Sequence, residues 1–171
     1  RIAADPLLAR VHAAAARAAV ADPAHDLEHL LRVARGTLAL GGAGLDPVEA
    51  ICAALLHDAV NLGKGEPARA AAGLRSAAVA RSLLAELGLG RDRVERIAEA
   101  IEDHGYSRGV SPRSPLGAAL QDADRLDALG ALGIARTFTT GARLGARYYD
   151  PEDPWAIARV RDDRRFSIDH F

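Results

Sequence analysis

The sequence has few of the residues that mark several common protein classes. It contains 1 cysteine and so cannot form an internal disulfide, which favours a reducing, cytoplasmic setting. No uninterrupted apolar run approaches the roughly 20 residues that a membrane helix needs, and no secretory signal is visible. We therefore expect a cytoplasmic protein that does not act on a membrane.

An excess of either charge is also missing. The 22 lysine and arginine residues are balanced by 23 aspartate and glutamate residues, so the formal net charge is −1. Such a chain has no electrostatic reason to bind a nucleic acid polymer. Lys64 is the only lysine. We interpret it as a hint that this position needs a compact ammonium group rather than a planar guanidinium.

Aromatic residues make up only 4% of the chain, whereas alanine and leucine dominate the 49% that is hydrophobic. This mixture favours close-packed helices over a β-sandwich. Alternating strand patterns are absent as well. With 171 residues, the chain fits one domain that buries roughly two-thirds of its unfolded surface. We predict a single all-α domain over residues 1–171.

Aspartate residues mark most of the predicted helix starts. Asp5 and Asp46 each precede a proline, which is a typical start for a helix. Asp26, Ser76 and Asp92 are expected to begin further helices. The predicted helices cover residues 6–20, 27–40, 47–58, 76–87, 93–104 and, as one long or kinked segment bent near Gly130 and Gly133, 116–141. The remainder, including residues 61–72 and 148–171, is predicted to be loop.

One stretch, ICAALLHDAVNLGK at residues 51–64, combines a buried helix with polar groups at its end. The pair His57 and Asp58 follows the apolar run directly. Such a pair is often only a helix C-terminal interaction. Likewise, Asp124 could belong to a solvated face with its charged neighbours. Taken one position at a time, these residues do not distinguish a site from ordinary surface charge.

Side chains able to bind a metal occur on three of the predicted helices. None of them forms a local metal motif by itself. His25 and His29 share a helix face, but Asp26 stands where a zinc peptidase would carry its glutamate base, so we do not favour that class. The candidate ligands are His25, His29, His57, Asp58, Asp122, Asp124 and Asp127.

The order of short motifs along the chain is more specific than any single residue. H-x-x-R-V at residues 29–33 is followed by L-L-H-D at 55–58 and by QDADRLDALG at 121–130. Further pieces are A-I-E-x-H at 100–104 and S-I-D-H-F at 167–171. This order resembles the HD-domain metal-dependent phosphohydrolase superfamily, most closely its small bacterial single-domain members that look like nucleoside triphosphate pyrophosphohydrolases. The resemblance implies a helical bundle with a metal site between the helices. It also implies a further C-terminal helix, which we expect to be either absent or disordered here.

The resemblance further implies one divalent metal ion held by two imidazoles and two carboxylates. A mixed nitrogen and oxygen set suits an octahedral ion with open positions, such as manganese, iron, nickel, cobalt or magnesium. Structural zinc fits less well because such sites favour cysteine. The implied ligands are His29, His57, Asp58 and Asp124.

Other residues are expected to act on the substrate or to support the ligands. Lys64 and His104 are implied to contact phosphate and to be catalytic, and Arg125 to bind substrate. Asp58 or Asp122 would orient the attacking water, since Asn61 stands where many members carry a glutamate. The residues expected to cap or support the ligand helix are His25, Asp26 and Arg32.

The expected function is hydrolysis of a phosphate ester or anhydride in a small molecule, most naturally a nucleotide. One candidate reaction cleaves a deoxynucleoside triphosphate to monophosphate and pyrophosphate. Two alternatives stay open: a non-catalytic sensor that binds metal or nucleotide, and a phosphodiesterase or alarmone hydrolase. The expected partners are the phosphorylated substrate and, in a homodimer, a second copy of the chain. Candidates for contacting a base are Tyr106, Tyr148, Tyr149 and Trp155.

Overall fold

The computed structural model describes residues 2–19, 26–60, 71–105 and 109–171, and it divides into two compact units after Leu126. Every regular element in these ranges is a helix, and the one β-bridge, between Arg147 and Phe166, is isolated. The all-α prediction is confirmed. None of the helices described has the length and apolar character to cross a membrane. The helices from the N-terminus to the unit boundary are α1 (Pro6–Ala18), α2 (Leu27–Gly41), α3 (Pro47–Leu56), α4 (Ala72–Glu86), α5 (Arg91–Asp103) and α6 (Pro115–Asp127).

Three aspartates begin helices as the sequence predicts. Asp5 and Asp46 each accept hydrogen bonds from two backbone N–H groups of the first helical turn. Asp26 accepts one from the backbone N–H of His29, at 2.9 Å. These side chains satisfy N–H groups that have no partner within the helix. The cap of α2 therefore also fixes the turn on which His29 lies.

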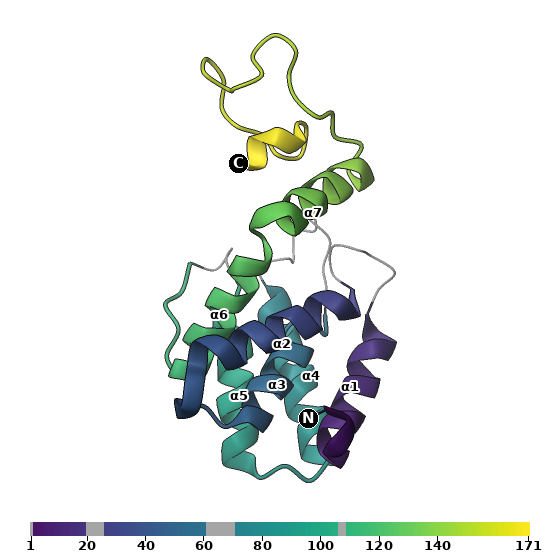
Figure 1. Ribbon diagram of the computed structural model, residues 1–171, viewed down its shortest axis with the longest axis vertical. Helices are drawn as coiled ribbons and strands as arrows, with labels where there is room; N and C mark the ends of the chain where they lie inside the picture. The colour runs from purple at the N-terminus through teal and green to yellow at the C-terminus, as the bar shows by residue number, and fades with distance from the viewer. Residues whose placement is uncertain (1, 20–25, 61–70, 106–108) are drawn as a thin grey trace. The chain divides into compact units, whose positions relative to one another are not determined.

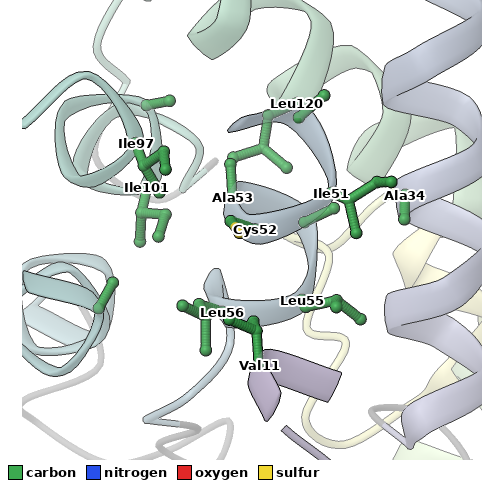
Figure 2. Packing of buried hydrophobic residues seen from close by; sticks show 14 of the residues in the cluster. Val11, Ala34, Ile51, Cys52, Ala53, Leu55, Leu56, Ile97, Ile101 and Leu120 are labelled. Carbon is green, nitrogen blue, oxygen red and sulfur yellow. The ribbon is translucent and has the colours of Figure 1, made fainter. Parts of the chain in front are cut away.

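Helix α3 lies at the centre of the first unit (Figure 1), where it contacts α1, α2, α4 and α5. All residues from Ala50 to Leu56 are buried. Figure 2 shows this helix packed against Val11 of α1, Ala34 of α2 and Ile97 of α5. Its alanines and Cys52 are small, so neighbouring helices approach it closely. The last turn of α3 therefore ends deep inside the unit.

The starts of α4 and α5 differ from the prediction. Helix α4 begins at Ala72, and Ser76 lies inside it, fully buried. The Ser76 hydroxyl accepts a hydrogen bond from the backbone N–H of Val60 at 3.0 Å, so it joins two segments rather than capping a helix. Helix α5 begins at Arg91. Asp92 is in its first turn, where a negative charge favours the helix dipole.

The predicted segment 116–141 is two helices, α6 and α7 (Gly130–Arg143), rather than one bent helix. Leu129 is extended and Gly130 has a positive φ of 67°, a conformation that residues other than glycine rarely adopt. Gly133 allows close approach to Ala128, because a Cβ atom there would overlap the Ala128 carbonyl. The chain therefore breaks where the glycines were expected to bend it.

The second unit, residues 127–171, holds α7, irregular chain and a short 3₁₀ helix, η5 (Ser167–His170). Arg159 is its main polar link, since its guanidinium pairs with Asp150 and Asp169 and lies over the Phe166 ring. Trp155 is 72% exposed. The prediction of loop with short turns over residues 148–171 is confirmed.

Candidate metal centre

Four helices of the first unit deliver polar side chains to one buried cluster. His29 comes from the first turn of α2, and His57 is the residue that ends α3, with Asp58 next in the turn. His104 follows the last residue of α5, and Asp124 lies on α6. His29 and His57 are 0% and 1% exposed. Such burial is unusual for a histidine that only ends a helix.

The two imidazoles face both carboxylates at similar distances. Nε2 of His29 lies 3.4 Å from Oδ1 of Asp124 and 3.9 Å from Oδ2 of Asp58. Nε2 of His57 lies 3.7 Å from the same two carboxylate oxygens. The four groups therefore converge on a common point.

Backbone carbonyls set the orientation of two of the rings. Nδ1 of His57 donates to the Ala54 carbonyl at 2.8 Å, and Nδ1 of His104 donates to the Ile101 carbonyl at 2.6 Å. A carbonyl only accepts, so Nδ1 carries the proton in both rings. Nε2 is then the atom that faces the cluster. This arrangement is typical of histidines that bind metals.

The cluster attracts positive charge. Burial lowers the pKa of His57, but the carboxylates of Asp58 and Asp124 outweigh burial and raise this pKa to about 9. Burial acts to raise the pKa of each carboxyl, yet His57 holds both well below their usual range. Burial and the charge of His57 lower the pKa of His104. A proton on His57 thus supplies part of the charge that a cation would bring.

The residues present fit a divalent ion. Nε2 of His57 is buried and makes no hydrogen bond within the described ranges, which is costly unless another group binds it. Two sets of donor atoms lie within 4.8 Å of one another, and opposite ligands of one ion are roughly 4 to 5 Å apart. The sets, which share His57, are His29 with His57 and Asp124, and His57 with Asp58 and His104.

The other predicted site residues differ in their burial and in their position relative to the cluster. Asp26 caps α2, and Arg32 is half-buried on the same helix. Asp122 is exposed two residues before Asp124, and residues two apart on a helix do not face each other. It is therefore not part of the cluster. Arg125 is exposed on α6. The predictions that fall outside the described residues concern His25, Asn61, Lys64 and Tyr106.

Two residues beside the cluster were not among the predicted site residues. Ser76 of α4 holds the turn after Asp58 through Val60. Gly73 lies one turn earlier, and a Cβ atom there would be 3.3 Å from the Ile101 carbonyl and 3.7 Å from the His104 ring. No motif marks either residue, because both act through α4, a helix that carries no candidate ligand.

Comparison with known proteins identifies the family of this helical unit. The model of the HD domain matches residues 26–129. This match includes the helices that carry all five members of the cluster. The chain belongs to the HD-domain family. The resemblance inferred from the order of the sequence motifs is therefore confirmed.

Relatives of this HD-domain chain include solved structures. YpgQ of Bacillus subtilis (strain 168) is 35% identical over 151 residues, which are 81% of this chain and 70% of YpgQ. A crystal structure of YpgQ in complex with ADP has a TM-score of 0.64 at 26% identity, with 84% and 72% of the two chains covered. A crystal structure from Lactobacillus plantarum has a TM-score of 0.74 at 28% identity, with 98% of this chain and 79% of that chain covered. The crystal structure of a predicted HD superfamily hydrolase from an uncultured Thermotogales bacterium has a TM-score of 0.63 at 31% identity, with 96% of this chain and 84% of that chain covered.

Proposed function

We propose that this HD-domain chain is a metal-dependent phosphohydrolase that acts on a nucleotide. The observation that carries the proposal is the convergence of two buried imidazoles and two carboxylates on one point, with nitrogen–oxygen distances of 3.4 to 3.9 Å. His29, His57, Asp58 and Asp124 would hold one divalent ion. The ion, when bound, would acidify a water molecule and polarise a phosphoryl oxygen.

The chain's own groups would orient the reactants around this centre. The Ala54 carbonyl keeps the His57 ring aligned. Asp58 is within 3.9 Å of Nε2 of His29, His57 and His104, so a water molecule held beside its carboxylate would be oriented from several sides. Asp122 is exposed, and we do not assign it this role. Asp58 is therefore the carboxylate that we propose for orienting water.

His104 is proposed to contact the substrate phosphate. Its Nε2 lies 3.9 Å from Oδ1 of Asp58, and its ring packs edge-on against His57 with centroids 4.9 Å apart. An imidazole beside the reacting centre can donate a hydrogen bond to a phosphoryl oxygen or to a leaving group. We propose Lys64 and Arg125 as additional phosphate contacts because both are cations near ligand residues in the sequence.

A nucleotide is favoured as the substrate by one relative, YpgQ, which has been crystallised in complex with ADP. We propose hydrolysis of a nucleoside triphosphate to monophosphate and pyrophosphate as the first reaction to test. Mn²⁺-, Ni²⁺-, Co²⁺- and Mg²⁺-loaded protein would be incubated with ribo- and deoxynucleoside triphosphates, diphosphates and phosphomonoesters. Release of phosphate and of pyrophosphate would be measured separately.

Pyrophosphate release that is lost in Asp124→Asn would support the proposal. Phosphate release from monoesters alone would redirect it to a phosphatase. Absence of both products with every metal and substrate would overturn it. Asp92→Asn is the matched control, because Asp92 is an exposed aspartate on α5 away from the cluster.

A further inference from the structure

A single buried amide connects the two helix segments that carry His104 and Asp124. Gln121, the only glutamine in the chain, is 5% exposed on α6. Its Nε2 donates to the Asp103 carbonyl at 2.9 Å and to the Val110 carbonyl at 3.3 Å. Only the NH₂ end of an amide can donate to two carbonyls, so the contacts fix the orientation of the side chain.

Asp103, which accepts the shorter of these bonds, is itself firmly held. Its carboxylate, 3% exposed, accepts three hydrogen bonds from Arg113, one from the backbone N–H and two from the guanidinium. Charged, multiply bonded contacts of this kind are the strongest hydrogen bonds in proteins. Arg113 thus secures the side chain of Asp103, while Gln121 secures its main chain.

His104 is the next residue after Asp103 and the first beyond α5. Its Nδ1 donates to the Ile101 carbonyl at 2.6 Å, so the ring moves with the last turn of α5, which ends at Asp103. Gly73 of α4 also lies beside this ring, since a Cβ atom there would be 3.7 Å from it.

Gln121 and Asp124 are three residues apart on α6 and share one helix face. A helix is rigid over one turn, so the bond from Gln121 to Asp103 sets the separation between Asp124 and the segment that carries His104. Neither partner of this bond belongs to the cluster. The bond nevertheless relates one proposed metal ligand to the proposed phosphate contact.

We propose that Gln121 is a positioning residue that holds His104 in register with the metal ligands. The expected effect of Gln121 on catalysis rests on the proposed function, whereas its effect on the position of the His104 ring does not. Loss of the amide donors would let the end of α5 move relative to α6, and His104 would then leave its place beside Asp58. The ligands themselves would stay in place.

The test uses Gln121→Met, which keeps the size of the side chain and removes the donors, and Gln121→Asn, which keeps the amide but shortens its reach. Ring ¹H–¹⁵N correlations of the histidines would be recorded on the metal-loaded full chain, with His12 of α1 as an internal reference. Metal content and steady-state kinetics per bound ion would be measured for each variant, alone and combined with His104→Ala.

We expect metal content to be retained, the His104 ring signals to shift, and kcat/KM to fall roughly tenfold, a typical loss when a supporting hydrogen bond is removed. The loss should vanish in the His104→Ala background. Unchanged His104 signals, or an equal loss in both backgrounds, would overturn the proposal. If Gln121→Met does not fold, Gln121→Asn carries the same comparison. An inactive wild type would refute the proposed function, while the ring signals would still decide the role of Gln121.

Discussion

Nε2 of His29 on α2 and Oδ1 of Asp124 on α6 lie 3.4 Å apart, and the two helices approach each other closely at Gly36. A Cβ atom at Gly36 of α2 would be 3.0 Å from the Cβ atom of Ala123, the residue next to Asp124. Small residues at this crossing let the helix that carries His29 come near the helix that carries Asp124. Helix packing therefore contributes to the distance between these two proposed ligands.

Asp124→Asn should remove the bound ion. Asp124 contributes a carboxylate facing both His29 and His57, and an amide is a much weaker metal ligand. We expect metal content by elemental analysis to fall from one ion per chain to near zero. Asp122→Asn serves as the control on the same helix and should retain its ion, since Asp122 is exposed. Equal metal content in both variants would contradict the ligand assignment.

Metal affinity should rise with pH. The folded, metal-free protein has His57 with a pKa raised to about 9, so at pH 7 an incoming ion must displace its proton. Affinity should therefore increase about tenfold per pH unit between pH 7 and 9 and then level off. Titration calorimetry in buffers of different ionisation enthalpy should show release of about one proton per ion at pH 7. No release would mean that His57 is neutral before binding.

Ser76→Ala should weaken the turn that carries Asp58. The buried Ser76 hydroxyl accepts the Val60 N–H, and removing a hydrogen-bond partner inside a protein costs about 1 to 2 kcal/mol of unfolding free energy. We expect a loss of that size in urea denaturation and a weaker affinity for the metal. Ser82→Ala is the matched control on α4, because the Ser82 hydroxyl is exposed and donates to Glu86 on the same helix. Identical behaviour of the two variants would disprove the role of Ser76.

The combined variant Arg93→Ala and Arg96→Ala should be strongly destabilised. Glu49 of α3 is 6% exposed, and Arg93 and Arg96 of α5 bond its carboxylate at 3.0 and 2.6 Å. Burial raises the pKa of Glu49, but the two guanidinium groups outweigh burial and lower it. Removing both leaves the buried carboxylate without these two cations, so the unfolding free energy measured in urea should fall. Adding Glu49→Leu should restore part of the lost unfolding free energy. Arg91→Ala, at an exposed position of α5, should change the unfolding free energy little.

The sequence was sufficient to predict the features governed by local chemistry. Asp5 and Asp46 with their prolines locate helix starts because capping depends on a few neighbouring residues. The buried run before His57 likewise identifies the central helix. The order of the motifs identifies the family, and from it the residues that converge. Hydrophobic periodicity alone could not have predicted that His29 lies near Asp124.

Features governed by tertiary packing could not be predicted in this way. A serine preceding an apolar run is typical of a cap, yet Ser76 is bonded to Val60 from another segment. Glycines within a helical pattern predict a bend, but the contacts of Gly133 with Ala128 produce a complete break. Gln121 is unremarkable until α5 is placed beside it. In each case the structure depends on a contact with another part of the chain, which the neighbouring sequence does not reveal.

The location of Trp155 decides which spectroscopic signals can follow this protein. It is the only tryptophan, it is 72% exposed, and it lies in the second unit, whereas the metal cluster belongs to the first. Intrinsic fluorescence will therefore emit at the red wavelengths of a solvated indole and will report on residues 127–171. Loss of the helical unit that holds the cluster will be visible in far-ultraviolet circular dichroism instead. Divergence of the two signals during denaturation would reveal separate unfolding of the units.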